Sequence, residues 1–151
     1  MKKIYVYFLL TCVAFSCHDD SDTVHETIID DLLTGTWLRV EYGYSPGSGY
    51  ITNTVPEVPP QTLRLDGDLS MTANIEGLTK YKFYRILYDT GYQLNVIAFF
   101  ETDPGSGPLS VSNLEHSYNA NWGEGSLTLA YRWCIEGCHE RFRKISNVQV
   151  D

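Results

Sequence analysis

Cys134, Cys138 and His139 fall within six consecutive positions and offer two kinds of chemistry. Thiolate and imidazole groups at this spacing bind zinc or take part in redox reactions. A structural zinc site needs further ligands, however, and the three other histidines of the chain form no matching motif. We therefore predict a disulfide between Cys134 and Cys138, no metal and no cofactor.

The familiar catalytic patterns are missing from the sequence. It contains no Gly-x-Ser-x-Gly, His-Glu-x-x-His or EF-hand motif, and neither Pro46–Gly49 nor Pro104–Gly107 continues into the Lys-Ser/Thr of a phosphate-binding loop. Asp66 and Asp68 flank a glycine, as turn residues do, and are not predicted to bind calcium. An acidic pair of the glycosidase kind, brought together from distant strands, stays open. We expect a protein that is not an enzyme.

The first residues have the pattern of a secretory signal peptide. Met1-Lys2-Lys3 is positively charged, and an apolar stretch runs from Ile4 to Phe15. Twelve helical residues span about 18 Å, which is too short for a hydrocarbon core of about 30 Å. Two cleavage patterns fit: ordinary signal peptidase cleavage after Ser16, which releases a soluble protein, or a bacterial lipobox in which Cys17 is acylated.

The number of cysteines favours the lipobox. Removal of residues 1–16 leaves three cysteines in an oxidising compartment. If Cys134 pairs with Cys138, Cys17 is left over, and a lipid on its sulfur accounts for it. Residues 1–16 are thus predicted to be a lipoprotein signal peptide, and the protein is predicted to be anchored to a membrane through Cys17.

Residues 17–35 are predicted to form an acidic tether and a short helix. Six acidic residues and no lysine or arginine lie between Cys17 and Gly35. Ile28, Ile29, Leu32 and Leu33 form one stripe of about two helical turns. A cysteine followed at once by acidic residues resembles the surface-export signal of Bacteroidetes-type lipoproteins. The resemblance implies a lipid-anchored protein of the outer membrane, with the periplasmic and the surface side both open.

Residues 36–151 have the composition and the patterns of an all-β domain. Aromatic residues make up 13% of the chain, and its net charge of -8 argues against binding to nucleic acid. Apolar residues alternate in five runs, and two further strands are predicted at Lys80–Tyr88 and His139–Ile145. Another is expected at Leu109–Val111 or Leu114–Tyr118. The five runs are Leu38–Tyr44, Leu63–Leu65, Leu69–Ile75, Leu94–Phe100 and Leu127–Trp133.

About eight short strands suggest a single antiparallel up-and-down barrel, with a β-sandwich as the alternative. Tight hairpins are predicted at Asp66-Gly67-Asp68 and Asp89-Thr90-Gly91. The proline-rich stretch from Ile51 to Pro60 is predicted to be an extended connection or a lid.

A short helix followed by Gly35-Thr36-Trp37 at the start of a strand resembles the Gly-x-Trp motif of lipocalin-like barrels. With the lipoprotein cysteine and a Cys-x-x-x-Cys hairpin near the end, the chain resembles the lipocalin-like lipoproteins of Bacteroidetes-type bacteria. In lipocalins this tryptophan plugs the closed end of the barrel, and an arginine of the last strand packs across it. The resemblance therefore implies a plug at Trp37, partnered by Arg141 or Arg143.

The last hairpin gives candidate ligand-binding residues. If Cys134 and Cys138 face each other across a three-residue loop, antiparallel counting places Tyr131 opposite Arg141. Trp133 then lies opposite His139, and Leu129 opposite Arg143. Tyr131, Trp133, Arg141 and Arg143 would share one face with Leu127 and Leu129, so an inward orientation would make the interior apolar with one or two cations.

Two functions follow from these expectations. The first is a cell-envelope lipoprotein whose barrel binds a small, partly apolar or anionic ligand, with Arg141 or Arg143 as the anion partner. The second is a filled barrel that acts as an accessory or protein-interaction module of an outer-membrane surface complex, through the loops Ser45–Pro60 and Thr102–Pro108.

Overall fold

The computed structural model describes residues 30–135 and 137–146. The predicted signal peptide, the predicted acylation site Cys17 and the first half of the predicted helix lie outside the described residues. The described part of that helix is a turn, in which Leu33 N and Thr34 N donate to Asp30 O. Within the described chain, no helix has the length and apolar character required to cross a bilayer.

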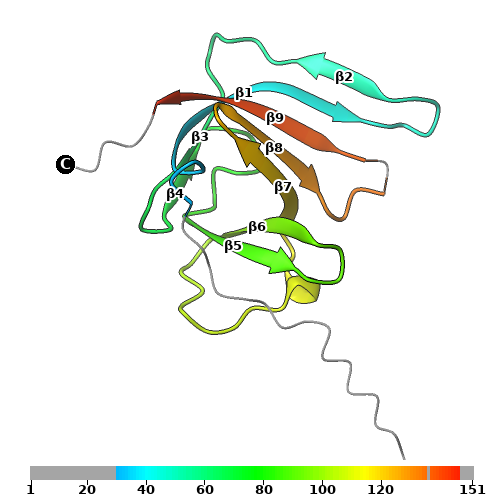
Figure 1. Cartoon of the computed structure of the whole chain (residues 1–151). Coiled ribbons are helices and arrows are strands. Elements are labelled where there is room, and N and C mark those ends of the chain that lie inside the picture. Colours follow the sequence, from blue (N-terminus) through cyan, green and yellow to red (C-terminus); the bar gives the residue numbers. More distant parts are fainter. Residues whose placement is uncertain (1–29, 136, 147–151) are drawn as a thin grey trace, which may run out of the picture.

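The described chain forms one antiparallel sheet in the order β4-β3-β1-β9-β8-β7-β6-β5, with β2 paired to β1 beside β3 (Figure 1). The elements are β1 (Gly35–Tyr44), β2 (Ile51–Thr54), β3 (Thr62–Leu65), β4 (Met71–Ala73), β5 (Phe83–Asp89), β6 (Leu94–Phe100), the 3-10 helix η1 (Val111–Asn113), β7 (Ser117–Gly123), β8 (Ser126–Tyr131) and β9 (His139–Ser146).

The sheet curls into a nearly closed up-and-down barrel, as predicted. β3 pairs with the first half of β1 and β2 with the second half, so these two strands occupy one position of an eight-position meander. The two ends of the sheet meet where Met71 N donates to Lys82 O and Tyr84 N donates to Leu69 O. An isolated bridge between Ser70 and Phe83 adds to this seam. The barrel thereby excludes the alternative of a β-sandwich.

Both predicted tight turns are present. Asp68 accepts hydrogen bonds from the backbone nitrogen and the hydroxyl of Ser70, at 2.9 and 2.6 Å. Asp89 Oδ1 accepts from the backbone nitrogens of Gly91 and Tyr92, both at 3.1 Å. These Asx-type bonds satisfy backbone donors that the strands leave unpaired.

The strands predicted from apolar patterns differ most from the observed ones in two places, and the runs Leu69–Ile75 and Leu127–Trp133 are shortened to β4 and β8. Ile51–Thr54 was predicted to lie in an extended connection and instead forms β2, which extends with the second half of β1 past the rest of the barrel (Figure 1). The strand expected at Leu109–Val111 or Leu114–Tyr118 is β7, which begins only at Ser117. Polar residues occupy much of β7, which weakens its apolar alternation.

The half of the barrel in which β1 begins is packed solid. Its fully buried side chains include Trp37, Leu65, Tyr84, Leu127 and Phe142. The hydroxyl of Tyr84 donates to Asp66 O at 2.8 Å, so the one polar atom of this ring is satisfied at the hairpin. This core occupies the end of the barrel where β1 begins.

The Asp30–Thr34 turn covers this end of the barrel. Trp37 Nε1 donates to Leu33 O at 2.8 Å, and Trp122 Nε1 donates to Asp30 Oδ2 at 2.6 Å. Lys144 Nζ lies 5.2 Å from the centre of the Trp37 ring and donates to Leu32 O at 2.9 Å. The cation beside Trp37 is thus Lys144, and the pairing of Trp37 with Arg141 or Arg143 implied by the resemblance is wrong.

A second, smaller core lies on the outer face of β5 and β6. Leu87, Val96 and Ala98 face outward and are covered by Val111 and Leu114 of the segment before β7. Arg85 is buried there and donates to Asp103 Oδ1 at 2.8 Å and to Gly105 O at 3.2 Å. The covering segment explains why both faces of these strands are apolar.

The predicted register of the last hairpin is wrong. Leu129 lies opposite Glu140 instead of Arg143, which is a shift of three residues. β8 already ends at Tyr131 and β9 begins only at His139, so the connection is much longer than three residues. Because an odd shift exchanges the two faces of a strand, Arg141 and Arg143 lie on the outer face.

Arg132, in this connection, forms an ion pair with Asp89 at the end of β5. Arg132 Nη2 lies 2.8 Å from Asp89 Oδ2, and the two side chains are only 16% and 12% exposed. Burial alone raises the pKa of the Asp89 carboxyl, but the bonds from Arg132, Tyr92 and Gly91 outweigh it and hold the pKa below its usual value.

We expect Asp89→Asn to lower the free energy of unfolding by about 1–2 kcal/mol at neutral pH, because charge-assisted bonds are lost. A depressed pKa in the folded state stabilises the fold above the unfolded value of about 3.9, and this contribution disappears as the pH falls through the folded value. Urea unfolding between pH 3 and 7 should therefore show a weaker pH dependence in the variant. Glu57→Gln, at an exposed ion pair, is the control. Equal pH dependence in Asp89→Asn and the native protein would contradict the prediction.

Candidate functional site

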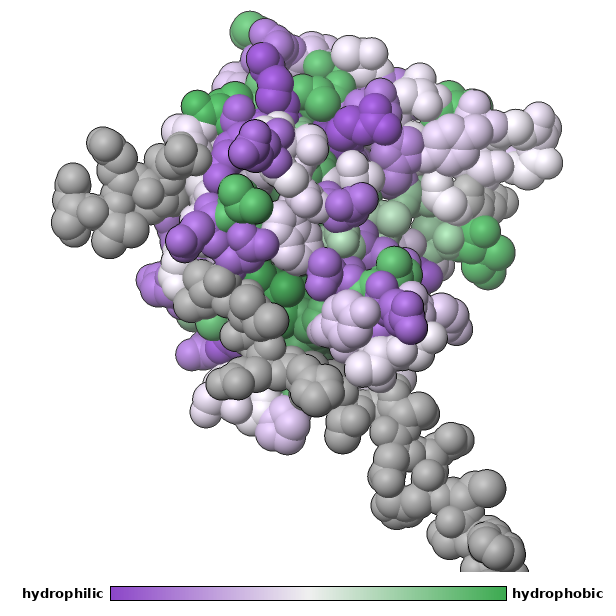
Figure 2. Space-filling view, viewed as in Figure 1, coloured by the Kyte–Doolittle hydropathy of each residue, from purple (hydrophilic) through white to green (hydrophobic). Residues whose placement is uncertain are grey.

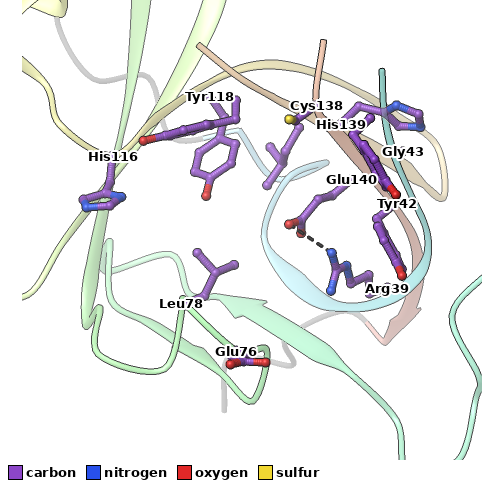
Figure 3. Close-up of a pocket in the computed structure, with 14 residues that line it drawn as sticks. Arg39, Tyr42, Gly43, Glu76, Leu78, His116, Tyr118, Cys138, His139 and Glu140 are labelled. Atoms are coloured by element: carbon purple, nitrogen blue, oxygen red, sulfur yellow. Dashed lines mark ion pairs between the residues drawn. The ribbon is translucent and has the colours of Figure 1, made fainter. Parts of the chain in front are cut away.

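A cavity of about 470 Å³ opens at the end of the barrel opposite Trp37 (Figure 3). It lies between the second half of β1, the start of β9, the end of β8 and the start of β7, with the segment after β4 as its floor. The residues that line it are Arg39, Tyr42, Gly43, Tyr44, Glu76, Gly77, Leu78, His116, Tyr118, Leu129, Tyr131, Cys138, His139 and Glu140. The barrel is therefore solid at one end and hollow at the other.

A bulge in β1 determines which side chains of this strand line the cavity. The pairing of β1 with β9 skips Val40 between Arg39 and Glu41. A bulge exchanges the faces of a strand, so Arg39 points inward before it and Tyr42 lines the cavity after it. The alternation of Leu38, Val40, Tyr42 and Tyr44 in the sequence therefore does not mark one face of the strand.

Aromatic rings form a continuous wall from the cavity into the barrel. The ring centres of Tyr131 and Tyr118 are 5.4 Å apart, and those of Tyr118 and Phe99 are also 5.4 Å apart. Tyr81 follows at 6.1 Å from Phe99 and contacts His116 at 5.0 Å. Burial raises the pKa of the Tyr118 hydroxyl, with a further contribution from Glu140, so this group stays protonated. The wall consists of aromatic rings, to which the three tyrosines add hydroxyl groups.

Arg39 and Glu140 form an ion pair on the opposite wall. Arg39 Nη2 lies 3.2 Å from Glu140 Oε1, and the two side chains are 16% and 22% exposed. Arg39 Nη1 donates to Gln61 Oε1 at 3.0 Å, and the guanidinium lies 4.9 Å from the centre of the Tyr42 ring. The dashed line in Figure 3 marks this pair at the centre of the site.

The ion pair leaves two buried polar atoms without a hydrogen bond. Among the described residues, neither Glu140 Oε2 nor Arg39 Nε has a partner. Burial raises the pKa of the Glu140 carboxyl, and the nearby charge of Arg39 opposes this only in part. An unpartnered carboxylate oxygen in a low-dielectric site is a strong acceptor for any donor that reaches it.

The rim of the cavity is held by a chain of polar groups. His139 Nε2 lies 3.0 Å from Glu41 Oε1, and the other ring nitrogen bonds to the hydroxyl of Tyr50. The rings of Tyr50 and His139 are also stacked, with an angle of 10° between their planes. A Cβ at Gly43 would lie 2.6 Å from His139 Cε1 and 2.7 Å from the Tyr50 hydroxyl. A larger residue at position 43 would therefore have to displace the side chains of His139 and Tyr50.

The structure separates the four predicted ligand residues. Tyr131 lines the cavity, whereas Trp133 is 54% exposed on the outside, where its indole nitrogen donates to Leu114 O at 3.0 Å. Arg141 and Arg143 also lie outside, paired with Glu41 and Glu57 at 3.4 and 2.9 Å. The prediction that Arg141 or Arg143 supplies a cation to the interior is therefore wrong.

Cys134 and Cys138 lie at disulfide-bonding distance, as predicted. The pair lies within the connection between β8 and β9, and Cys138 forms part of the cavity wall. Tyr131 N donates to Cys138 O at 3.0 Å, which fixes the end of this connection to the barrel. In the part of the chain that the structure describes, no group of three or more His, Cys, Asp or Glu side chains has the arrangement of a metal site.

The residues predicted from the sequence do not include Arg39 and Glu140, which are the charged residues at the centre of the site. Arg39 is a charged residue within the otherwise apolar segment Trp37–Val40. This charge next to the tryptophan was the feature of the sequence that could have indicated a polar group inside the barrel. Comparison of the chain with protein-family models, curated proteins and solved structures gave no match.

Proposed function

We propose that the protein is a lipid-anchored lipoprotein of the cell envelope whose lipocalin-like barrel binds a small, partly apolar ligand without catalysing a reaction. The open cavity of about 470 Å³ above a solid core is the observation that carries this proposal. Ligand pockets of proteins commonly measure roughly 300–1,000 Å³ and combine apolar walls with a few polar groups. The aromatic wall and the Arg39–Glu140 pair match that description.

The proposed attachment rests on the start of the sequence. Acylation of Cys17 would place the barrel beyond an acidic tether, on the periplasmic or the surface side of the outer membrane. The hollow end of the barrel would then take up a ligand from the surrounding solution or from the nearby membrane.

We expect Leu78→Trp to block the cavity, because Leu78 points into it from the segment after β4 (Figure 3). Native mass spectrometry of the protein made in its own host should show a bound mass, and this mass should be absent from the variant. Ile145→Trp is the control, since Ile145 is 50% exposed at the other end of the barrel. The proposal fails if the native protein carries no mass beyond its acyl chains, or if the mass persists in Leu78→Trp.

Exposed apolar side chains near the mouth favour a second candidate function, an accessory module that binds another envelope protein. Tyr44, Tyr50, Ile51, Trp133 and Ile135 are between 40% and fully exposed. On the face that Figure 2 shows, hydrophobic residues lie in small separate groups among hydrophilic ones. Crosslinking on intact cells tests this candidate: a specific adduct lost in Trp133→Ser would support it.

A further inference from the structure

The charges that face the cavity are unfavourable for an anion. Arg39 is the only lysine or arginine among the cavity-lining residues of the described chain, and it is already paired with Glu140 and bonded to Gln61. Glu76 adds a second carboxylate at the floor. An anionic ligand would meet two carboxylates and no unpaired arginine or lysine.

Two buried atoms of the ion pair lack a hydrogen bond among the described residues, Glu140 Oε2 and Arg39 Nε, and the carboxylate oxygen is the acceptor of the two. One carboxylate oxygen faces Arg39, whereas the other is buried and accepts no hydrogen bond from any described residue. Figure 3 shows the carboxylate directed toward the middle of the cavity, between Arg39 and Tyr118. Because this oxygen is buried, a ligand donor reaches it only by displacing the side chains around it, and the donor would then satisfy an acceptor that the protein itself leaves unpaired.

The aromatic wall opposite Glu140 favours a ligand that carries a flat apolar body next to that donor. Tyr118 and Tyr131 both line the cavity, with their ring centres 5.4 Å apart, and aromatic rings attract both flat apolar groups and cations. Burial raises the pKa of the Glu140 carboxyl, and a bound cation would favour its ionised form.

From this geometry we infer that the ligand is an amine with a flat apolar body, whose ammonium group donates to Glu140 while the body lies against Tyr118 and Tyr131. This inference deepens the proposed function and rests on it. It also replaces the expectation of an anion partner at Arg141 or Arg143.

Three matched probes test the inference: 2-(1-naphthyl)ethylamine, 2-(1-naphthyl)ethanol and 3-(1-naphthyl)propionate. The full protein, made in its host and held in lipid nanodiscs, is titrated with each probe. Leu78→Trp in the same nanodiscs measures uptake of the probe by lipid. We expect the amine to bind at least about ten-fold more tightly than the propionate.

The variant Glu140→Gln keeps the shape of the side chain and removes its charge. We expect it to weaken amine binding by about ten-fold or more and alcohol binding by less than about three-fold. Arg143→Gln, at an exposed ion pair far from the cavity wall, should leave all three affinities unchanged. If Glu140→Gln does not fold, the order of the three affinities for the native protein still tests the inference.

The outcomes separate this inference from the proposed function. If the probes bind the native protein but the propionate binds as tightly as the amine, the inference is overturned and the cavity function stands. An unchanged amine affinity in folded Glu140→Gln has the same meaning. If no probe binds the native protein better than Leu78→Trp, and no native mass adduct is found, both proposals fail.

Discussion

Replacing Trp37 with alanine should lower the free energy of unfolding by about 3–5 kcal/mol, because the fully buried ring would leave a large void in the core. Two further contacts would be lost with it. The carbonyl of Leu33 would lose its bond from Trp37 Nε1, and Lys144 would lose the ring beneath its ammonium group. The measurement is urea unfolding followed by far-ultraviolet circular dichroism.

Two other variants separate the contributions at this position. Trp37→Phe retains most of the bulk but not the donor, so we expect a loss of about 1–2 kcal/mol. Trp133→Ala removes the same side chain from an exposed position and should cost less than about 1 kcal/mol. Similar losses for Trp37→Ala and Trp133→Ala would show that Trp37 is not the centre of the core.

Short-range patterns predicted the closed end of the barrel well. The hairpin at Asp66–Asp68 and the turn after Asp89 follow from local chemistry, in which a side-chain carboxylate bonds backbone donors two or three residues away. The five apolar runs and the further predicted segments together give about eight strands, and with them the antiparallel barrel, although β2 is not among the predicted strands. These features depend on neighbours in the sequence.

The candidate site depended on two features that alternation does not reveal. The bulge at Val40 exchanges the faces of β1, and the long connection between β8 and β9 shifts the register by three residues. Each changes which side chains enter the cavity without changing which segments are strands. As a result the charged residues inside are Arg39 and Glu140, and the arginines of β9 lie outside.

The orientation of β5 and β6 could not be predicted from the sequence either, because a distant segment of the chain covers their outer face. Val96 and Ala98 belong to the alternating run Leu94–Phe100, and they face outward beneath the segment before β7. The buried guanidinium of Arg85 fixes the loop that leads into this segment through Asp103 and Gly105. A strand that is buried on both faces has no polar side to mark its orientation.

Arg39→Met should cost about 2–4 kcal/mol at neutral pH, since it leaves Glu140 as a largely buried charge without its partner. The long unbranched side chain of methionine fills much of the same volume near Tyr42, so lost packing adds little to the loss of stability. Arg143→Met removes an exposed partner of Glu57 and should change stability by less than about 1 kcal/mol. Urea unfolding at pH 7 compares the two variants.

The pH dependence and a double variant test the cause of this loss. Burial already raises the pKa of Glu140, and removal of the arginine raises it further; a raised acid pKa makes the folded state relatively more stable as the pH falls. The difference in stability between Arg39→Met and the native protein should therefore shrink toward pH 4. The double variant Arg39→Met, Glu140→Leu should regain most of the loss, because an apolar pair replaces a buried ion pair at little cost. A double variant as unstable as Arg39→Met would mean that Arg39 acts through its bond to Gln61 and its contact with Tyr42 instead of through the charge of Glu140.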